Sequence, residues 1–430
     1  MRLQTLEEWL QWQTSLHDQA IELGLDRVSQ VGRSLGLGKI AGQVITVAGT
    51  NGKGSTVAAY ETWLHNAGFR VASYTSPHLL QYNERVRNSL EMVDDSTLCA
   101  AFAAVEAARD DIALTYFEYG TLAALYLMQQ WNPDFALLEV GLGGRLDAVN
   151  IIDADLVHLT PIGIDHENWL GDTRDKIGYE KAGVLRPNIP VILNDREPPR
   201  SVLNEIDRLQ CQCLRIARDY QVTPLLNDWL WQAADYAVRF NPELPGRHQV
   251  DNFAGVLAGL SCLVNLEDYS VESVGANFGG IQLAGRFQQI DSAIPASLYI
   301  DVGHNQDAAR VMTANLTELA PNGRCVVLLG MLSDKRVDLF IETMAEVVDA
   351  WWLVGLDGDR GLSATELEAR IGEKVFVEQR FMSASDAYSH ALSSLGNQDI
   401  MLVTGSFVTV ENWLRALPDS GESNSYGSKH

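Results

Sequence analysis

Residues 44–60 read VITVAGTNGKGSTVAAY: an apolar run, then glycines, then a helix-forming segment. A strand, a glycine loop and a helix in this order place backbone N–H groups around phosphate oxygens. The standard pattern G-x-x-x-x-G-K-[ST] is not met, because Gly49 lies too close to Gly52. A further glycine also separates Lys53 from Ser55. The alternative is a tight turn whose glycines serve only the backbone, but the added lysine and hydroxyl favour a phosphate site.

Length and composition indicate a protein of at least two domains, since 430 residues exceed one ordinary hydrophobic core. No apolar run reaches eighteen residues, so we expect no membrane span. The N-terminus MRLQTLEEWLQWQ carries Glu and Gln where a signal peptide needs an apolar core, so we expect no export. The five cysteines are an odd, scattered set, which argues against a disulfide framework and predicts a cytoplasmic protein.

The charge balance is strongly acidic, with 32 Lys and Arg against 56 Asp and Glu, a net charge of −24. Such a surface repels nucleic acid and anionic membranes, so we expect neither as a partner. Anionic ligands would have to be bound by local cations, backbone N–H groups and metal ions.

Strands and helices alternate along most of the chain, which predicts α/β domains built on parallel sheets covered on both faces. We expect an N-terminal ATP-binding domain of the phosphate-loop type over residues 1–285 and a linker over 286–296, where the periodicity breaks. A smaller Rossmann-like domain is expected over 297–416, with helices near 306–319, 336–348, 364–371 and 384–395. The small, polar residues 417–430 predict a disordered tail.

Polar residues at predicted strand ends are the candidates for chemistry, because ligands of open α/β sheets collect there. Glu139 ends an otherwise apolar strand, and a buried carboxylate must be paired or bind a metal. The alternative is a structural ion pair between Glu139 and Arg145. Ser76 follows a second strand, and Asp165 with His166 follows a third. Either set could face a metal, although a lone histidine is more often a packing residue.

The second domain repeats this arrangement. Asp301 and His304 follow one of its strands, and Arg286 precedes the predicted junction. A cleft between two α/β domains is the usual place for a small-molecule site. Lys181 lies in a short predicted helix beside Glu180, and surface charge is the default interpretation of such a pair.

Eight motifs together resemble the Mur ligase superfamily, in its folylpolyglutamate synthase branch. In chain order they are VAGTNGKGST, YTSPHL, LEVGLGGRLDAVN, DHENWLG, YEKAGVL, AGRFQ, DVGHN and GSF. The segments LGLDRV and LTYFEYGTLAAL look more like the bacterial bifunctional members, which combine dihydrofolate synthase and folylpolyglutamate synthase activities. The resemblance runs from about residue 15 to 410.

The resemblance implies an ATP-dependent amide ligase. It would add L-glutamate to dihydropteroate, forming dihydrofolate, and further glutamates to tetrahydrofolate, through an acyl phosphate with release of ADP and phosphate. Two Mg²⁺ ions and a CO₂-derived carbamate on Lys181 are implied, which reverses the surface-charge interpretation of that lysine. A monomer is also implied.

The resemblance assigns each site residue a role. Lys53, Lys181, His166 and Glu139 would be the catalytic residues. The ATP site would be formed by Gly52, Lys53, Gly54, Ser55, Asn252, Arg286, Asp301 and His304. The metal ligands would be Ser76, Glu139, His166 and carbamylated Lys181. The pterin site would comprise Leu16, His17, Asp18, Thr115, Tyr116, Phe117, Glu118, Leu146, Asp147 and Ala148.

Three other functions remain open at this point. A folylpolyglutamate synthase that lacks dihydrofolate synthase activity would differ from the bifunctional members at few residues. A cell-wall Mur ligase would share the loop, the metal site and Lys181, but would have an N-terminal nucleotide-sugar domain and no TYFEYG segment. A non-catalytic ATP-binding switch would keep Lys53 and Ser55 without needing Glu139, His166 and Lys181 as a set.

Overall fold

The computed structural model of the chain describes residues 3–17, 21–319 and 322–418. The chain forms two compact units, which we describe separately. The first comprises Met1–Gly163, Leu170–Glu243 and Gln249–Ile281, and the second comprises Ile164–Trp169, Leu244–His248 and Gln282–His430. Most of the predicted tail, from residue 419 onward, lies outside the described residues.

The first unit is built on an eight-stranded sheet with strand order β4-β3-β2-β5-β1-β6-β7-β8. Strands β2, β5, β1, β6, β7 and β8 are parallel, and only β3 and β4 at one edge run antiparallel. A separate antiparallel sheet has the order β11-β10-β9. In chain order the elements up to residue 281 are α1 (Leu6–Thr14), α2 (Asp26–Ser34), β1 (Gln43–Ala48), α3 (Lys53–Asn66), β2 (Val71–Tyr74), η1 (Tyr82–Arg85), β3 (Val86–Asn88), β4 (Glu91–Met92), α4 (Asp95–Arg109), α5 (Tyr116–Trp131), β5 (Phe135–Glu139), η2 (Ala148–Ile151), β6 (Leu156–Leu159), α6 (Glu167–Leu170), α7 (Arg174–Ala182), β7 (Pro190–Leu193), α8 (Arg200–Leu209), β8 (Gln212–Arg215), β9 (Gln221–Pro224), β10 (Trp229–Ala233), β11 (Tyr236–Phe240), α9 (Arg247–Leu263), η3 (Leu266–Asp268) and α10 (Val271–Ala276).

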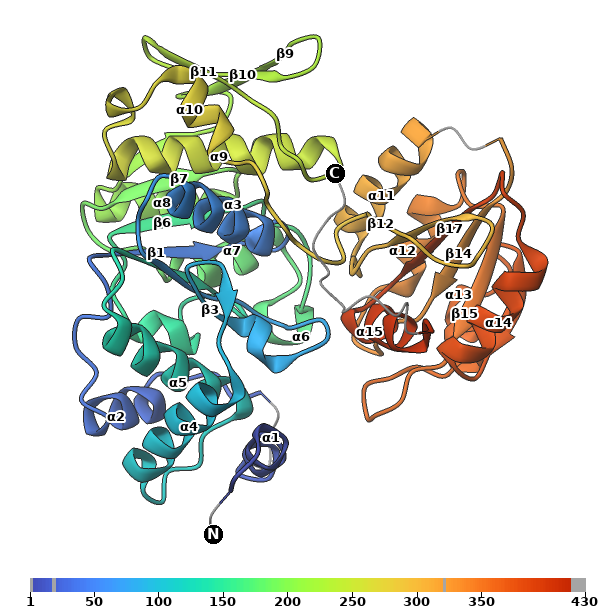
Figure 1. Cartoon of the computed structure of the whole chain (residues 1–430), viewed down its shortest axis with the longest axis horizontal. Coiled ribbons are helices and arrows are strands. Elements are labelled where there is room, and N and C mark those ends of the chain that lie inside the picture. Colours follow the sequence, from blue (N-terminus) through green and yellow to red (C-terminus); the bar gives the residue numbers. More distant parts are fainter. Residues whose placement is uncertain (1–2, 18–20, 320–321, 419–430) are drawn as a thin grey trace. The chain divides into compact units, whose positions relative to one another are not determined.

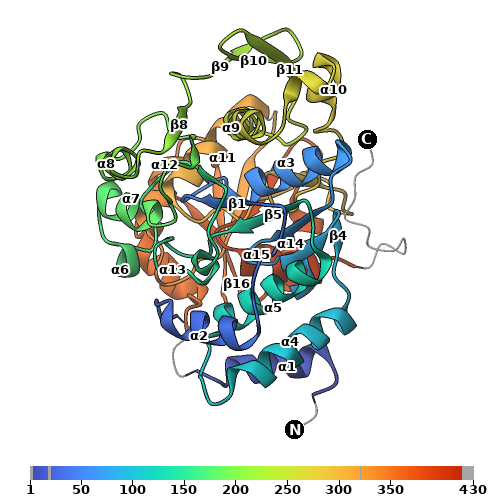
Figure 2. The ribbon, with the colours of Figure 1, turned by 90° about the vertical axis from the view of Figure 1, so that its left-hand side faces the viewer.

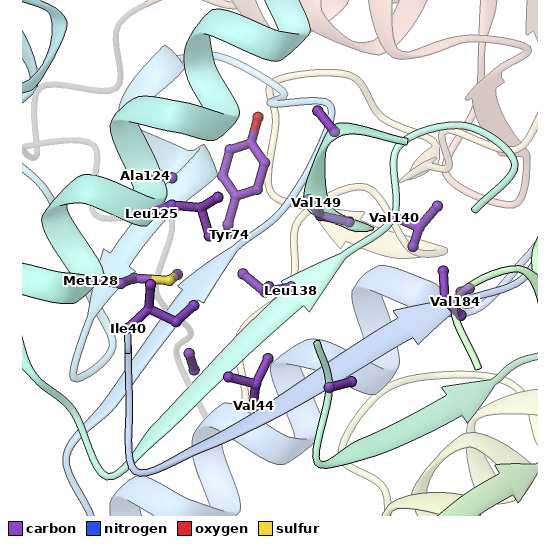
Figure 3. Close-up of a cluster of buried hydrophobic side chains, with 14 of the residues drawn as sticks. Ile40, Val44, Tyr74, Ala124, Leu125, Met128, Leu138, Val140, Val149 and Val184 are labelled. Carbon is purple, nitrogen blue, oxygen red and sulfur yellow. The ribbon is translucent and has the colours of Figure 1, made fainter. Parts of the chain in front are cut away.

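The two faces of this sheet carry different helices because successive side chains of a strand point to opposite sides. On one face, Val44 of β1 and Leu138 of β5 pack with Leu125 and Met128 of α5 (Figure 3). Helices α2, α4, α7 and α8 contribute to the same core. On the other face, α3 and α9 lie side by side (Figures 1 and 2), and a Cβ on Gly259 of α9 would stand 1.8 Å from the Tyr60 hydroxyl of α3.

The second unit has a six-stranded sheet with the order β12-β13-β17-β14-β15-β16, parallel except for β12. Helices α11, α12 and α13 pack on one face around Met312, Phe340 and Leu367. Its elements are β12 (Gln288–Ile290), β13 (Ser297–Ile300), α11 (Gln306–Leu319), β14 (Cys325–Leu329), α12 (Val337–Met344), β15 (Ala350–Val354), α13 (Ala364–Ile371), β16 (Val377–Phe381), α14 (Ala384–Ser394), β17 (Ile400–Thr404) and α15 (Phe407–Ala416).

The predicted fold class of two α/β domains on mainly parallel sheets is confirmed. The sequence did not predict the antiparallel edge strands β3 and β4 or the sheet β9–β11. These strands have two to five residues and several exposed positions, so their apolar alternation is weak. No helix within the described ranges combines the length and apolarity needed to cross a membrane. Residues 286–296, the predicted linker, fall within the second unit and include β12, and their role as a hinge stays a prediction.

Candidate active site

The glycine loop joins the end of β1 to the start of α3, as the opening sequence predicted. Gly49 has φ +151° and Gly52 has φ +92°, a region that L side chains rarely adopt. A Cβ on Gly49 would stand 1.8 Å from the Thr160 hydroxyl, and one on Gly52 would stand 2.8 Å from Oδ1 of Asn252. Gly52 is the N-cap of α3 and has no side chain to accept from the first-turn N–H groups. The loop therefore has the form of an anion-binding helix N-terminus.

Two lysines converge on the loop. Nζ of Lys53 donates to the carbonyl oxygens of Gly49 at 3.2 Å and Thr50 at 3.1 Å. Nζ of Lys181, on α7, donates to the same Gly49 carbonyl at 2.7 Å. Lys181 is only 5% exposed, so the surface-charge interpretation of this residue is wrong. The meeting of the two lysine side chains at one glycine carbonyl places this part of α7 beside the glycine loop.

Helix α9 supplies a polar wall to the loop. Nδ2 of Asn252 donates to Oε1 of Gln249 at 2.9 Å, and Nε2 of Gln249 donates to the Ser55 hydroxyl at 3.2 Å. Ser55 and Gly54 lie in the first turn of α3. Asn252 was predicted from the sequence as a nucleotide contact, whereas Gln249 was not. The available signal was its spacing, because residues three apart on a helix share a face.

Glu139 is the last residue of β5 and is 5% exposed. Its Oε2 accepts a hydrogen bond of 3.2 Å from the backbone N–H of Ser76. Val47 of β1 pairs with Glu139 in register, so the ends of β1 and β5 are neighbours. Arg145, the alternative partner considered for Glu139, forms its ion pair with Glu180 at 3.0 Å.

The donors at this sheet edge fit a hard cation. A carboxylate, a serine hydroxyl and water or phosphate oxygens are the ligands that Mg²⁺ prefers. Within the described ranges, no three His, Cys, Asp or Glu side chains gather into a metal-binding group. Glu139 and Ser76, two of the predicted metal ligands, are neighbours in this unit.

The loop after β5 is held by Asp147. Its carboxylate accepts from the N–H groups of Leu142 at 2.8 Å and Val149 at 3.0 Å. Burial raises the pKa of Asp147 to about 6, although these backbone bonds and the charge of Lys53 oppose the rise. Leu146 beside it is half-buried, and Ala148 begins η2 and is buried.

The start of α5 carries four residues predicted to touch the pterin. Thr115 and Glu118 form a capping box, and Glu118 also forms an ion pair of 2.9 Å with Arg27. These two are therefore at least partly structural. The ring of Phe117 packs on Gly141, where a Cβ would stand 2.6 Å from Cζ.

A cavity of about 1060 Å³ lies against α1 and the start of α5. It brings together His17 and Tyr116 among the predicted pterin residues, while Leu16 is half-buried outside the lining and Asp18 lies outside the described residues. His17 also forms an ion pair of 2.8 Å with Glu22 when its ring is protonated. The lining residues are Leu6, Glu7, Leu10, Gln11, Gln13, Thr14, His17, Gln81, Tyr82, Asn83, Asp95 and Tyr116.

In the second unit, Asp301 follows β13 and is 9% exposed. It accepts from the N–H groups of Phe287 at 2.9 Å and Gly303 at 2.7 Å. Burial raises the pKa of Asp301, against the opposing charge of Arg286. The Arg286 guanidinium lies over the Phe407 ring, 5.5 Å from its centroid.

Asp165 is the centre of a charged cluster in this unit. It forms ion pairs with Lys335 at 2.6 Å and His304 at 3.2 Å, and it accepts from Asn305 at 3.3 Å. Burial would raise the pKa of Asp165, but His304, His166 and Lys335 outweigh it and hold this pKa well below its usual range. Lys335 was not named from the sequence, although it directly follows the strand-end segment GMLSD.

His166 lies in the segment Ile164–Trp169 of the second unit, with φ +54° and its Nε2 3.9 Å from Asp165. Its grouping with Ser76, Glu139 and Lys181 as a metal ligand stays a prediction.

Comparisons with known proteins agree on one family. Residues 285–407 match the family model of the Mur ligase, glutamate ligase domain. The dihydrofolate synthase/folylpolyglutamate synthase of Escherichia coli is 40% identical over 96% of this chain and 95% of its own length. The Haemophilus influenzae protein of the same name is 38% identical over 95% of this chain and 97% of its own length.

Solved structures give the same result. E. coli FolC in complex with DHPP and ADP superposes with a TM-score of 0.89 and 38% identity, over 96% of this chain and 97% of that one. A bifunctional folylpolyglutamate synthase/dihydrofolate synthase with Mn, AMPPNP and L-glutamate bound has a TM-score of 0.87 and 38% identity, over 96% and 98% of the two chains. The chain therefore belongs to the dihydrofolate synthase/folylpolyglutamate synthase family of the Mur ligases.

Proposed function

We propose that the protein is an ATP-dependent ligase that joins L-glutamate to dihydropteroate and adds further glutamates to tetrahydrofolate. The observation that carries the proposal is the pair of lysines on the Gly49 carbonyl, at a sheet edge that also holds the buried carboxylate of Glu139. An ATP-binding switch needs only the loop and its lysine. Lys53, Lys181 and Glu139 together suit a reaction that brings two anions together.

The proposed reaction has two steps. An oxygen of the pteroate carboxylate attacks the γ-phosphorus of ATP, and the bond from that phosphorus to the ADP oxygen breaks. The α-amine of glutamate then attacks the acyl carbon, the bond to phosphate breaks, and the amine loses a proton. The chain's task is to position the reactants and neutralise charge, because each step joins a nucleophile to an anionic group.

The ATP phosphates would bind at the N-terminus of α3. The N–H groups of Gly52, Gly54 and Ser55 and the ammonium of Lys53 supply hydrogen-bond donors and positive charge there. An arriving phosphate competes with the carbonyls of Gly49 and Thr50 for the Lys53 ammonium. Asn252 would contact the nucleotide from α9, and Arg286, Asp301 and His304 are assigned to it from the second unit.

Ser76 and Glu139 would hold Mg²⁺, which neutralises phosphate charge when bound. Glu139 already accepts from the Ser76 N–H, so the serine is held at the carboxylate. The roles of His166 as a further ligand and of a second Mg²⁺ belong to this proposal as well.

Lys181 would react with CO₂ to form a carbamate, which replaces a cation with a carboxylate-like metal ligand. The position of this buried lysine beside the glycine loop supports the proposal. The carbamate nitrogen keeps one hydrogen, so its bond to the Gly49 carbonyl can persist.

The pterin acid would bind near the cavity that His17 and Tyr116 line. Its walls combine aromatic rings with amide and carboxylate groups, which suits a flat heterocycle with donors and acceptors on its edge. Tyr116 and Tyr82 provide the ring faces. We also propose a monomer, and a reducing cytoplasmic location that suits five free cysteines.

The test is ADP release by the purified protein with ATP, glutamate and either dihydropteroate or tetrahydrofolate. We expect ADP only when a folate acid and glutamate are both present, with dihydrofolate as the product from dihydropteroate. If product forms from tetrahydrofolate but not from dihydropteroate, the protein is a folylpolyglutamate synthase without dihydrofolate synthase activity. Steady ATP hydrolysis indifferent to both acids would refute the ligase.

A further inference from the structure

The loop that carries Ser76 is shaped by the short helix that follows it. Residues 75–81 connect β2 to η1 (Tyr82–Arg85). Backbone contacts already bring the two together, since the N–H of Thr75 donates to the carbonyl of Arg85 at 2.9 Å. The loop is thus folded back onto η1, and two side chains of η1 fasten it further.

Glu84 makes the larger contribution. Its Oε2 accepts from the N–H of Leu79, and its Oε1 accepts from those of Leu80 and Gln81, each at 2.7 Å. Three short bonds from consecutive amides to one carboxylate are charge-assisted, and such bonds are about twice as strong as neutral ones. Because all three donors are backbone groups, they fix the path of the loop rather than one side chain.

Arg85 holds the middle of the same loop. Its Nε donates to Nδ1 of His78 at 2.8 Å, and the residue is only 8% exposed. The guanidinium lies 5.2 Å from the ring centroid of Tyr82 and 5.6 Å from that of Tyr116. Cation–π contact with two rings holds the guanidinium in place, so His78 meets a fixed donor.

Both residues bind parts of the loop that follow Ser76. Glu84 binds amides three to five residues after Ser76, and Arg85 binds the side chain two residues after it. Ser76 itself donates its N–H to Glu139. The serine is therefore held from both sides, by Glu139 at its own amide and by η1 beyond it.

We propose that Glu84 is a positioning residue that holds the Ser76 loop in the conformation that receives the divalent cation, with Arg85 as its support. The proposal rests on the assignment of Ser76 and Glu139 as cation ligands above. Partners that orient metal ligands typically change metal affinity by about 10- to 100-fold when they are removed. Glu84→Gln keeps the size of the side chain but replaces one acceptor oxygen with an NH₂ donor and removes the charge.

The matched control is Asp94→Asn. Asp94 is likewise a carboxylate bonded to a backbone N–H, that of Thr97 at 2.8 Å, but it caps α4 and its hydrogen bonds go to Ser96 and Thr97. It lies ten positions from Glu84 in the sequence and outside the cavity lining. A general loss of stability should affect both variants alike.

The first measurement is Mn²⁺ binding followed by electron paramagnetic resonance, with ADP present and no turnover. We expect the Kd for Mn²⁺ to rise about tenfold in Glu84→Gln and to stay within about twofold in Asp94→Asn. Affinity for ADP without metal should stay near wild type in both. Equal Mn²⁺ affinity in wild type and Glu84→Gln would overturn the proposal, whereas wild type that binds no Mn²⁺ would instead refute the metal assignment.

The second measurement is made on the metal-free wild-type protein, so it does not depend on whether a variant folds. Hydrogen–deuterium exchange of metal-free wild type should find the amides of residues 79–81 protected, because each donates to Glu84. Rapid exchange of these amides would overturn the proposal. In Glu84→Gln we expect the protection to fall at residues 79–81 and to be unchanged in α4, while Asp94→Asn should do the reverse.

Discussion

Nζ of Lys181 donates a hydrogen bond of 2.7 Å to the carbonyl oxygen of Gly49, 132 positions earlier in the chain. This bond joins the motif YEKAGVL to the glycine loop. The sequence shows only that the loop precedes the motif, not that the two are in contact. It also places a buried amine beside the phosphate-binding helix terminus, where a surface lysine was the default expectation.

Replacing Lys181 with alanine should reduce kcat/KM by about 10³, a loss of roughly 4 kcal/mol of transition-state stabilisation, because a charged group at the reacting phosphate is removed. Added acetate or formate should restore part of the activity by occupying the place of the carbamate. The measurement is ADP release with and without the acid. If Lys181→Ala loses the same activity with and without added acetate or formate, at every acid concentration, carbamylation of Lys181 is contradicted.

Replacing Lys53 with alanine should remove most ATP binding while leaving the fold intact, because the Lys53 ammonium donates to the Gly49 and Thr50 carbonyls of its own loop. The Kd for ATP should rise by at least about tenfold, since a charge-assisted contact contributes about 1.5–3 kcal/mol. Calorimetric titration with ATP checks this, and the far-ultraviolet circular dichroism should match wild type. Near-normal turnover would contradict the role given to the loop.

Gly49→Ala should destabilise the protein by at least about 3 kcal/mol, through a strained φ and a clash with a neighbouring element. The added Cβ would stand 1.8 Å from the Thr160 hydroxyl and 2.9 Å from the Thr160 carbonyl oxygen. Gly36→Ala is the control, because Gly36 has φ +73° but no heavy atom within 4 Å of its Cβ position. Its cost should be about 1–2 kcal/mol. Urea unfolding measures the loss of unfolding free energy in both variants. Equal losses would show that the structure relieves the clash at Gly49→Ala.

Asp147 should make stability depend on pH between about 4 and 6. Burial raises the pKa of its carboxyl from 3.8 to about 6, so the unfolded chain loses this proton first as the pH rises. Its contribution is therefore complete below about pH 4 and is lost as the pH passes 6, by about 3 kcal/mol at 1.36 kcal/mol per pKa unit. Asp147→Asn should lack this dependence. Parallel pH profiles of the free energy of unfolding for the two proteins would refute the raised pKa.

Much of the fold could be predicted from local pattern. The helix at the end of the glycine loop and helices α11, α12, α13 and α14 of the second unit lie close to their predicted ranges. The antiparallel sheet β9–β11 could not be predicted, because its strands are short and packed on other elements rather than on one alternating face.

The site was predicted in part. The strand, glycines, lysine and hydroxyl predicted a phosphate loop although their spacing departs from the standard pattern, and the order of eight motifs indicated the family, which is confirmed. Glu84 was missed although it stands near Ser76, because a glutamate after a loop usually signals only a solvated turn. Gln249 and Lys335 were missed for a related reason, since each acts through a partner far away in the sequence.

The sequence by itself determined most of the helices and parallel strands, the glycine loop and the chemical types available at each strand end. Those properties are local, since backbone propensity, apolar periodicity and glycine's freedom at positive φ depend on a few neighbouring residues. The tertiary structure decided which polar groups meet: Lys181 with Gly49, Ser76 with Glu139, and Arg145 with Glu180 rather than Glu139. Such partners are chosen by strand order and helix packing, because a buried charge takes whichever acceptor the fold brings within about 3 Å.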